Sequence, residues 1–197
     1  RELGRSLVVE GVKLRDVAEG MELHILEHGG KLAFPVNISQ NAMAAHFTPN
    51  SNDDVSFKAG DLVKLDVGAQ VDGWLGDTAT TVEVGTRNWQ SLIQASERAL
   101  QQALEVTQDG ISVGTIGGVV GRSIKETGFH PVVNLSGHEM KRYNLHAGLS
   151  IPNYDDGTLT KVRGNMLLAI EPFATNGQGQ VSNGRSGNIY RVLRDRP

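Results

Sequence analysis

Residues 66–77, DVGAQVDGWLGD, carry an aspartate at each end and the pair Asp72-Gly73 near the middle. An Asp-Gly pair between two runs of apolar and β-branched residues is a strong signal for a two-residue hairpin turn. The flanking runs Leu62–Ala69 and Trp74–Val84 are therefore predicted to form two antiparallel strands. Aspartate is depleted in strands, so the two acidic residues inside this hairpin need an explanation.

The predicted turn decides which way these carboxylates point. A two-residue turn places Asp66 opposite Ala79. Side chains alternate between the two faces of a strand, so Asp77, two residues from Ala79, lies on the same face as Asp66. The two aspartates are then diagonal neighbours, about 7–8 Å apart at the backbone. This separation suits one or two divalent ions. On the hairpin alone, however, two solvent-facing aspartates are the favoured explanation.

A third carboxylate and three histidines change this balance. Glu171 lies in the apolar run LLAIEPF, within a predicted strand Asn165–Phe173. Burial of a carboxylate there is costly unless it is coordinated or paired, for example with an arginine. His138 in NLSGHEM, His146 in LHAGLS and His46 in AAHFTPN add imidazole donors. The remaining histidines are expected at the surface or in packing: His24, His28 and His130. Together the carboxylates and imidazoles favour a metal enzyme.

The rest of the chain indicates an α+β fold with a repeated order. Residues 1–9 are predicted to be the tail of a helix, and three further helices are predicted at Leu14–His28, Asn88–Thr107 and Thr115–Thr127. The last of these contains the glycines Gly117, Gly118 and Gly121, which are costly in a helix interior unless a neighbour packs closely against them. The order of helix pair, strands, helix pair and strands indicates two similar α+β halves.

Composition excludes several classes of protein. The net charge of -3 over 197 residues gives no reason to expect nucleic acid or an anionic membrane as a partner. Cysteine is absent, which agrees with a cytoplasmic protein and leaves histidine, aspartate and glutamate as the metal ligands. No apolar run approaches the length that spans a bilayer. The opening residues RELGRSLVVEG contain no apolar stretch typical of a signal peptide, so we expect none.

Five segments together resemble the methionine aminopeptidases, and in particular the type 2 branch of archaea and eukaryotes. They are AFPVNIS, AAHFTPN, KLDVGAQVDGWLGDTATTVEVG, NLSGHEMKRYNLHAG and AIEPFAT, in family order. The spacing is also similar to the family's, with 11 residues from Asp66 to Asp77, 61 more to His138 and 33 more to Glu171. The resemblance covers almost the whole chain, and the second and fourth segments favour type 2 over type 1.

The resemblance implies the pita-bread fold, in which two pseudo-symmetric α+β halves share a curved antiparallel sheet. It also implies two divalent metal ions, with Co, Mn, Fe and Zn as the candidates. By position, four residues match the family's metal ligands: Asp66, Asp77, His138 and Glu171. His46 and His146 match two histidines that act in catalysis and contact the substrate. Phe34 and Leu145 fall where the family lines the pocket for the methionine side chain.

The chain departs from the family pattern after Glu171. The family has a fifth ligand, a glutamate that bridges both metals and follows an inserted helical subdomain. Only 26 residues follow Glu171 here, and none is glutamate. Residues 176–197 resemble the beginning of the inserted subdomain. We therefore expect residues 1–197 to be one pita-bread catalytic domain, truncated at both ends and lacking the bridging ligand and the last strand or strands.

The implied function is metal-dependent hydrolytic removal of the N-terminal methionine from nascent proteins, with little or no activity in the fragment alone. The expected substrates are nascent polypeptide N-termini, and the expected enzyme is a cytoplasmic monomer that binds neither nucleic acid nor membrane. Ribosome association follows from the family's task, although no residue of this sequence indicates it. Two alternatives remain: a proline-specific peptidase of the same fold, and a non-catalytic binding domain that has kept the fold.

Overall fold

The computed structural model describes residues 1–184, 187, 189 and 190. Residue contacts divide the chain into two compact units. The first contains Arg1–Ala69 and Asp77–Thr86, and the second contains Gln70–Gly76 and Arg87–Ser182. The predicted subdomain start at 176–197 lies partly outside the described residues.

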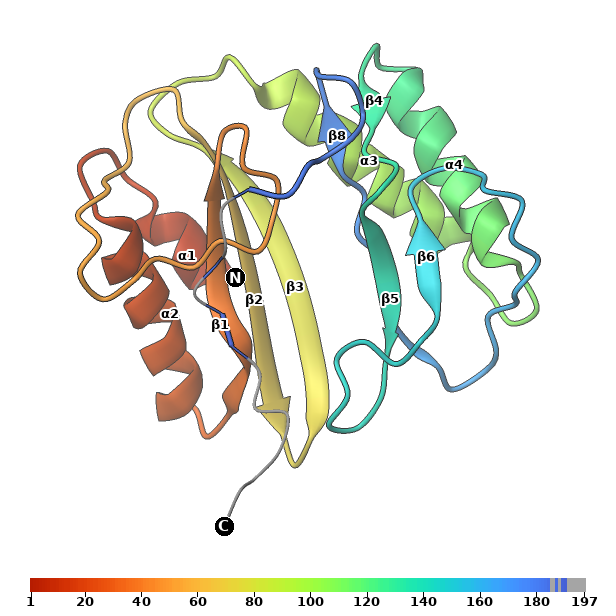
Figure 1. Cartoon of the computed structure of the whole chain (residues 1–197), viewed down its shortest axis with the longest axis horizontal. Helices are drawn as coiled ribbons and strands as arrows, with labels where there is room; N and C mark the ends of the chain where they lie inside the picture. The colour runs from red at the N-terminus through yellow and green to blue at the C-terminus, as the bar shows by residue number, and fades with distance from the viewer. Residues whose placement is uncertain (185–186, 188, 191–197) are drawn as a thin grey trace. The chain divides into compact units, whose positions relative to one another are not determined.

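The first unit has two helices and a three-stranded sheet (Figure 1). Its elements are α1 (Glu2–Leu7), α2 (Leu14–Glu27), β1 (Lys31–Gln40), β2 (Leu62–Val71) and β3 (Trp74–Glu83), and the strand order is β1-β2-β3. The predicted helix and both strands of the aspartate hairpin are therefore present, with ends that differ by one or two residues.

The core of this unit explains why its helices and strands form. Along β2, Val63, Leu65 and Val67 are buried, and the residues between them are only partly buried. This alternation directs one face of the sheet to the core, where it joins buried residues of α2 such as Val17 and Met21. Full burial of one such side chain contributes about 1.5–3 kcal/mol. Asp66 lies on the opposite face of β2, away from this core.

The second unit contains two longer helices and several short strands. Its elements are α3 (Gln90–Val106), α4 (Val113–Lys125), β4 (His130–Pro131), β5 (Ser136–Met140), β6 (Ser150–Pro152), β7 (Leu167–Ala169) and β8 (Ala174–Thr175). The strands form a three-stranded sheet of order β6-β5-β7 and the pair β4-β8. Residues of α3 and α4, including Ala99, Ala103, Ile116 and Val120, form its core with Ile151 of β6.

The glycines of α4 allow the backbone of a neighbouring segment to approach the helix. A Cβ atom at Gly117 would clash with the carbonyl oxygen of Tyr154 and lie 2.7 Å from that of Pro152. A Cβ atom at Gly121 would lie 3.1 Å from the carbonyl oxygen of Asn153. The expected close packing is therefore present, and its partner is the chain that continues from β6.

Replacing Gly117 with alanine is expected to lower the free energy of unfolding by about 1–3 kcal/mol, because the clashing atoms belong to backbone that cannot move aside. Gly20 in α2 is the matched control, since a Cβ atom there would lie 3.4 Å from a flexible leucine side chain. Gly20→Ala should instead be neutral or stabilising by up to about 1 kcal/mol through helix propensity. Urea denaturation measures both variants, and equal stability of the two would contradict this packing.

The predicted strand Asn165–Phe173 is wrong in its extent. The structure has the shorter strands β7 and β8, and Glu171 lies in the irregular segment that connects them. Pro172 follows Glu171 directly and has no amide hydrogen for a ladder hydrogen bond. The apolar run continues past this interruption, which is why the composition alone predicted one long strand.

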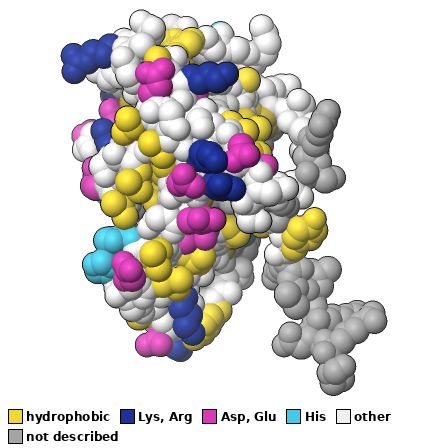
Figure 2. Space-filling view, turned by 90° about the vertical axis from the view of Figure 1, so that its left-hand side faces the viewer, with side chains coloured by type: hydrophobic (Ala, Val, Ile, Leu, Met, Phe, Trp, Pro, Cys, Tyr) yellow, Lys and Arg dark blue, Asp and Glu magenta, His cyan; other side chains and the backbone are white. Residues whose placement is uncertain are grey.

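Charged side chains of both signs are interspersed with apolar ones in the view of Figure 2. Two histidines of the helix region, His24 and His28, are exposed, and their rings are tilted by 46° with centroids 4.1 Å apart. The expected surface position of these residues is therefore confirmed, and His130 in β4 is exposed as well. Among the helices of the described residues, none is long and apolar enough to cross a lipid bilayer.

Candidate metal centre

The aspartate hairpin has the predicted turn and register. Asp72 and Gly73 both have positive φ, 50° and 84°, as a type I′ turn requires. At the open end, the amide of Val84 donates to the carbonyl of Asp61 at 2.9 Å. Both ends of the hairpin therefore give the same register, in which Asp66 and Asp77 share one face. Both carboxylates are partly buried rather than fully solvent-exposed.

An aromatic ring covers this face beside the aspartates. In the same register Gly68 of β2 lies opposite Asp77, and a Cβ atom at Gly68 would lie 2.7 Å from Cδ1 of Phe34. The absence of a side chain at Gly68 thus allows the ring of Phe34, from β1, to approach β2 closely. Phe34 was predicted to line a substrate pocket, and its place next to the aspartate face agrees with that prediction without testing it.

Lys64 lies on the same strand face as Asp66 and was not singled out from the sequence. Its ammonium group donates a hydrogen bond to the carbonyl of Asn41 at 2.7 Å. Burial lowers the pKa of the Lys64 amine to about 8, because a charged ammonium is disfavoured away from water. The sequence does contain a signal for Lys64: it lies two residues before Asp66 in a predicted strand, and residues two apart in a strand share a face.

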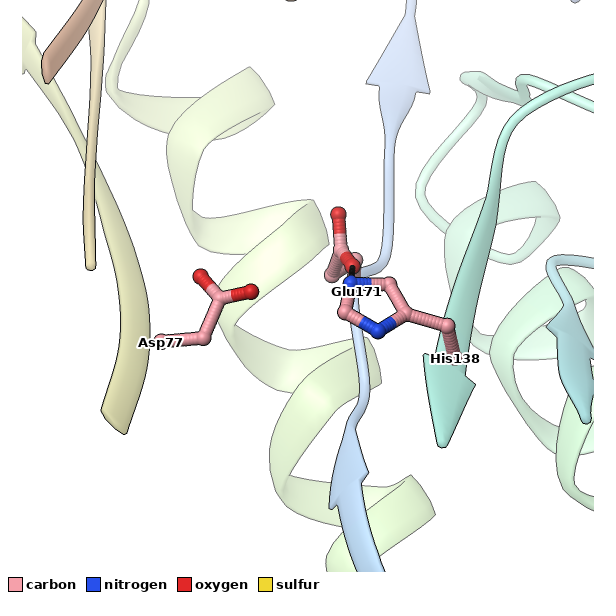
Figure 3. Close-up of side chains that lie close together, drawn as sticks. All are labelled: Asp77, His138 and Glu171. Carbon is pink, nitrogen blue, oxygen red and sulfur yellow. Dashed lines mark ion pairs between the residues drawn. The ribbon is translucent and has the colours of Figure 1, made fainter. Parts of the chain in front are cut away.

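In the second unit, His138 and Glu171 form a pair (Figure 3). His138 Nε2 lies 3.2 Å from Glu171 Oε1, and the side chains are 10% and 31% exposed. Glu171 was expected to be buried and is only partly so, although its Oε1 atom is inaccessible and accepts no hydrogen bond among the described residues. The partner of Glu171 in the described part of the chain is a histidine, and no described arginine pairs with it.

A glycine brings these two residues together. His138 of β5 is paired with Ala169 of β7. A Cβ atom at Gly137 would clash with the carbonyl oxygen of Ala169 and lie 3.2 Å from the amide nitrogen of Glu171. Only glycine at this position lets the segment that carries Glu171 pass so close to β5. The motif NLSGHEM contains this glycine, but its role depends on a segment that is distant in the sequence.

The loop after β5 brings a second histidine, His146, close to His138. The amide of Ala147 donates to the carbonyl of Glu139 at 2.8 Å, and the amide of Glu139 donates to the carbonyl of Leu149 at 2.9 Å. These bonds fold the loop back along β5, so the ring centroids of His138 and His146 lie 4.3 Å apart. The second unit therefore brings together three of the predicted site residues.

The two remaining predicted residues, His46 and Leu145, lie in loops. His46 is exposed in a loop of the first unit and has a left-handed backbone, with φ of 63°. Leu145 directly precedes His146 and is half-buried. Asp66, Asp77, Phe34 and His46 thus belong to the first unit, and His138, His146, Glu171 and Leu145 belong to the second.

The His138–Glu171 pair fits a divalent cation. Burying a carboxylate oxygen away from water costs free energy unless a cation or a proton lies next to it. Imidazole nitrogen and carboxylate oxygen are donors that Zn, Mn, Fe and Co accept in proteins. The shared face of Asp66 and Asp77 offers further carboxylate oxygens of the same kind.

Comparison with known proteins gives a consistent result. The model of metallopeptidase family M24 matches residues 1–191. A methionine aminopeptidase of Methanocaldococcus jannaschii is 47% identical over 197 residues, covering 100% of this chain and 67% of that protein. One from Thermococcus onnurineus is 46% identical, covering 98% of this chain and 65% of that protein. The chain thus spans about two thirds of the length of these relatives.

Solved structures show the same likeness in three dimensions. The methionine aminopeptidase of Thermotoga maritima has a TM-score of 0.86 at 30% identity, covering 94% of this chain and 78% of that one. The prolidase of Pyrococcus horikoshii has a TM-score of 0.73 at 26% identity, covering 87% of this chain and 49% of that one.

These findings confirm the α+β pita-bread fold and the resemblance to methionine aminopeptidases. They also confirm the predicted metallo-aminopeptidase class and its use of divalent metal. Proline-specific enzymes share the fold, but the curated relatives that match at 41–47% identity are named methionine aminopeptidases. The chain belongs to metallopeptidase family M24.

Proposed function

We propose that the complete protein removes the N-terminal methionine from newly made polypeptides by metal-dependent hydrolysis. The observation that carries this proposal is the buried oxygen of Glu171 facing the imidazole of His138, in a chain of a metallopeptidase family. The similarity to archaeal methionine aminopeptidases supports the choice of substrate. The segments around His46 and His138 support assignment to the type 2 branch.

Four residues are proposed to hold two divalent ions: Asp66, Asp77, His138 and Glu171. Asp77, His138 and Glu171 offer two carboxylates and one imidazole, and Asp66 adds a carboxylate from the face that it shares with Asp77. This mixed oxygen and nitrogen set suits Mn, Fe, Co or Zn. Such ions, when bound, polarise a peptide carbonyl and lower the pKa of water near neutrality.

The two remaining histidines are proposed to act on the peptide itself. An imidazole N–H of His146, beside His138, can donate to the oxygen on which negative charge develops as the carbonyl is attacked. His46 is proposed to donate to the substrate from the loop of the first unit. Phe34 and Leu145 are proposed to line the pocket for the methionine side chain, because both are apolar and each lies next to a candidate ligand or histidine.

The setting of the reaction is also a proposal. Nascent chains are made in the cytoplasm, and we propose that the protein acts there as a monomer, in reach of the ribosome and without binding nucleic acid or membrane. The mixed charges and the net charge of -3 support the last point. We further propose that the relatives' additional third of sequence supplies the bridging glutamate, so that the 197-residue chain alone has weak or no activity.

Peptide cleavage by the complete protein tests the substrate. With added Mn²⁺ or Co²⁺, hydrolysis of Met-Ala-Ser is expected to exceed that of Ala-Pro-Ser by at least about 100-fold in kcat/KM, the discrimination that a shaped pocket can supply. Chelation should abolish the activity, and readdition of metal should restore it. Faster cleavage of the proline peptide would support the proline-specific alternative, and no cleavage of either would support a binding domain.

A further inference from the structure

The C-terminal end of α2 carries two histidines on one face. His24 lies in the last turn of the helix, and His28 is the residue directly after the helix. Residues four apart on a helix lie one above the other, and the two ring centroids are 4.1 Å apart. Both side chains are exposed, and both belong to the first unit. None of the residues proposed for the metal centre belongs to α2, so this histidine pair has no role in that centre.

A hydrogen bond determines which ring nitrogen His28 can offer to a ligand. Its Nδ1 atom lies 2.8 Å from the carbonyl oxygen of His24. A carbonyl oxygen only accepts hydrogen bonds, so Nδ1 carries the proton, and the neutral ring keeps its lone pair on Nε2. Histidines that bind metal usually donate their other ring nitrogen to a carbonyl or carboxylate in this way, which fixes the ring and raises its basicity. His28 is therefore held in the form in which an imidazole binds metal.

The backbone at this end of α2 also favours a cation. The helix ends at Glu27, and the last carbonyl groups of a helix give its C-terminus a partial negative charge. Among the residues that the structure describes, no third His, Cys, Asp or Glu side chain completes a group with the histidine pair. An ion bound here would therefore have two imidazole ligands from the protein, with water at its other positions.

We propose that His24 and His28 form a surface metal site that binds one Zn²⁺, Ni²⁺ or Cu²⁺ ion through both imidazoles. Two histidines four residues apart on one helix face are an arrangement that binds zinc in proteins. Imidazole suits these three ions, whereas Mn²⁺ prefers carboxylate and water. The surface site thus differs in its ion preference from the carboxylate-rich set of Asp66, Asp77 and Glu171. It goes beyond the proposed peptidase function and does not depend on it.

Calorimetric titration of the complete protein with Ni²⁺ tests the histidine pair. His24→Ala and His28→Ala are each expected to weaken the surface site by at least about tenfold, because loss of a residue that only orients a ligand already costs that much. Each variant leaves a single imidazole, so the two losses should be similar. His130→Ala is the matched control, since it removes an exposed histidine that lies in β4 and leaves the pair intact. Its Ni²⁺ binding should equal that of the unsubstituted protein.

Thermal unfolding provides the second measurement. Without metal, both variants should unfold close to the unsubstituted protein, because the replaced side chains are exposed. Added Ni²⁺ should raise the unfolding temperature more in the unsubstituted protein than in either variant, since an ion that binds only the folded chain stabilises it. Retention of the full Ni²⁺ affinity by either variant would overturn the paired site. An equal loss of affinity in His130→Ala would overturn it as well.

Discussion

Replacing Glu171 with glutamine in the complete protein is expected to lower metal-dependent turnover of Met-Ala-Ser by at least about 100-fold. The substitution keeps the size of the side chain and removes its negative charge. The oxygen that lies 3.2 Å from His138 Nε2 then carries much less charge with which to hold a cation. Steady-state kinetics at several Mn²⁺ concentrations measure the effect, which should persist at the highest metal concentration.

A second glutamate provides the control for this change. Glu126 is more exposed than Glu171 and forms a surface pair with Arg98 at 2.7 Å, so Glu126→Gln removes a carboxylate of the same unit without touching the candidate site. Such surface pairs contribute at most about 1 kcal/mol to stability. Glu126→Gln should retain full turnover. If Glu171→Gln did so as well, Glu171 could not be a metal ligand.

The 197-residue chain by itself is expected to turn over Met-Ala-Ser at least about 100-fold more slowly than the complete protein. The proposed fifth carboxylate, contributed by sequence that the longer relatives have in addition, would then be missing. Two cations held close together repel each other, and each carboxylate removed leaves more of that repulsion uncompensated. The second ion should therefore bind more weakly than the first.

Parallel assays of the two proteins decide this point. Both are titrated with Mn²⁺ and assayed at equal concentration, and circular dichroism establishes that the shorter chain is folded. A folded shorter chain with weak occupancy of the second ion is the expected result. Robust turnover by the shorter chain would show that Asp66, Asp77, His138 and Glu171 suffice without a fifth carboxylate.

The hairpin was accessible to sequence reasoning because its determinants are local. The pair Asp72-Gly73 has positive φ at both residues, as its composition predicts. The alternation of side chains then placed Asp66 and Asp77 on one face without any knowledge of the rest of the chain. Local patterns also predicted α2 and α3 within two residues at each end.

Contacts between distant segments were less accessible. The sequence marked Glu171 as unusual but placed it inside a strand, because an apolar run hides the interruption at Pro172. The role of Gly137 depends on which segment passes beside it, and that segment lies more than thirty residues away. Nothing local predicts that Arg142 binds the carbonyl of Asp72, since both lie in exposed turns of ordinary composition. The family resemblance supplied the ligand set that local physics left open.

The most direct test of the account is the position of bound metal. Crystals of the complete protein soaked in Mn²⁺ should show two anomalous scattering peaks, each within about 2.0–2.5 Å of ligand atoms, as is usual for divalent ions. The account predicts that Asp66, Asp77, His138 and Glu171 all contribute ligand atoms to these two ions. Peaks that involve only His138 and Glu171, with both aspartates directed elsewhere, would contradict it.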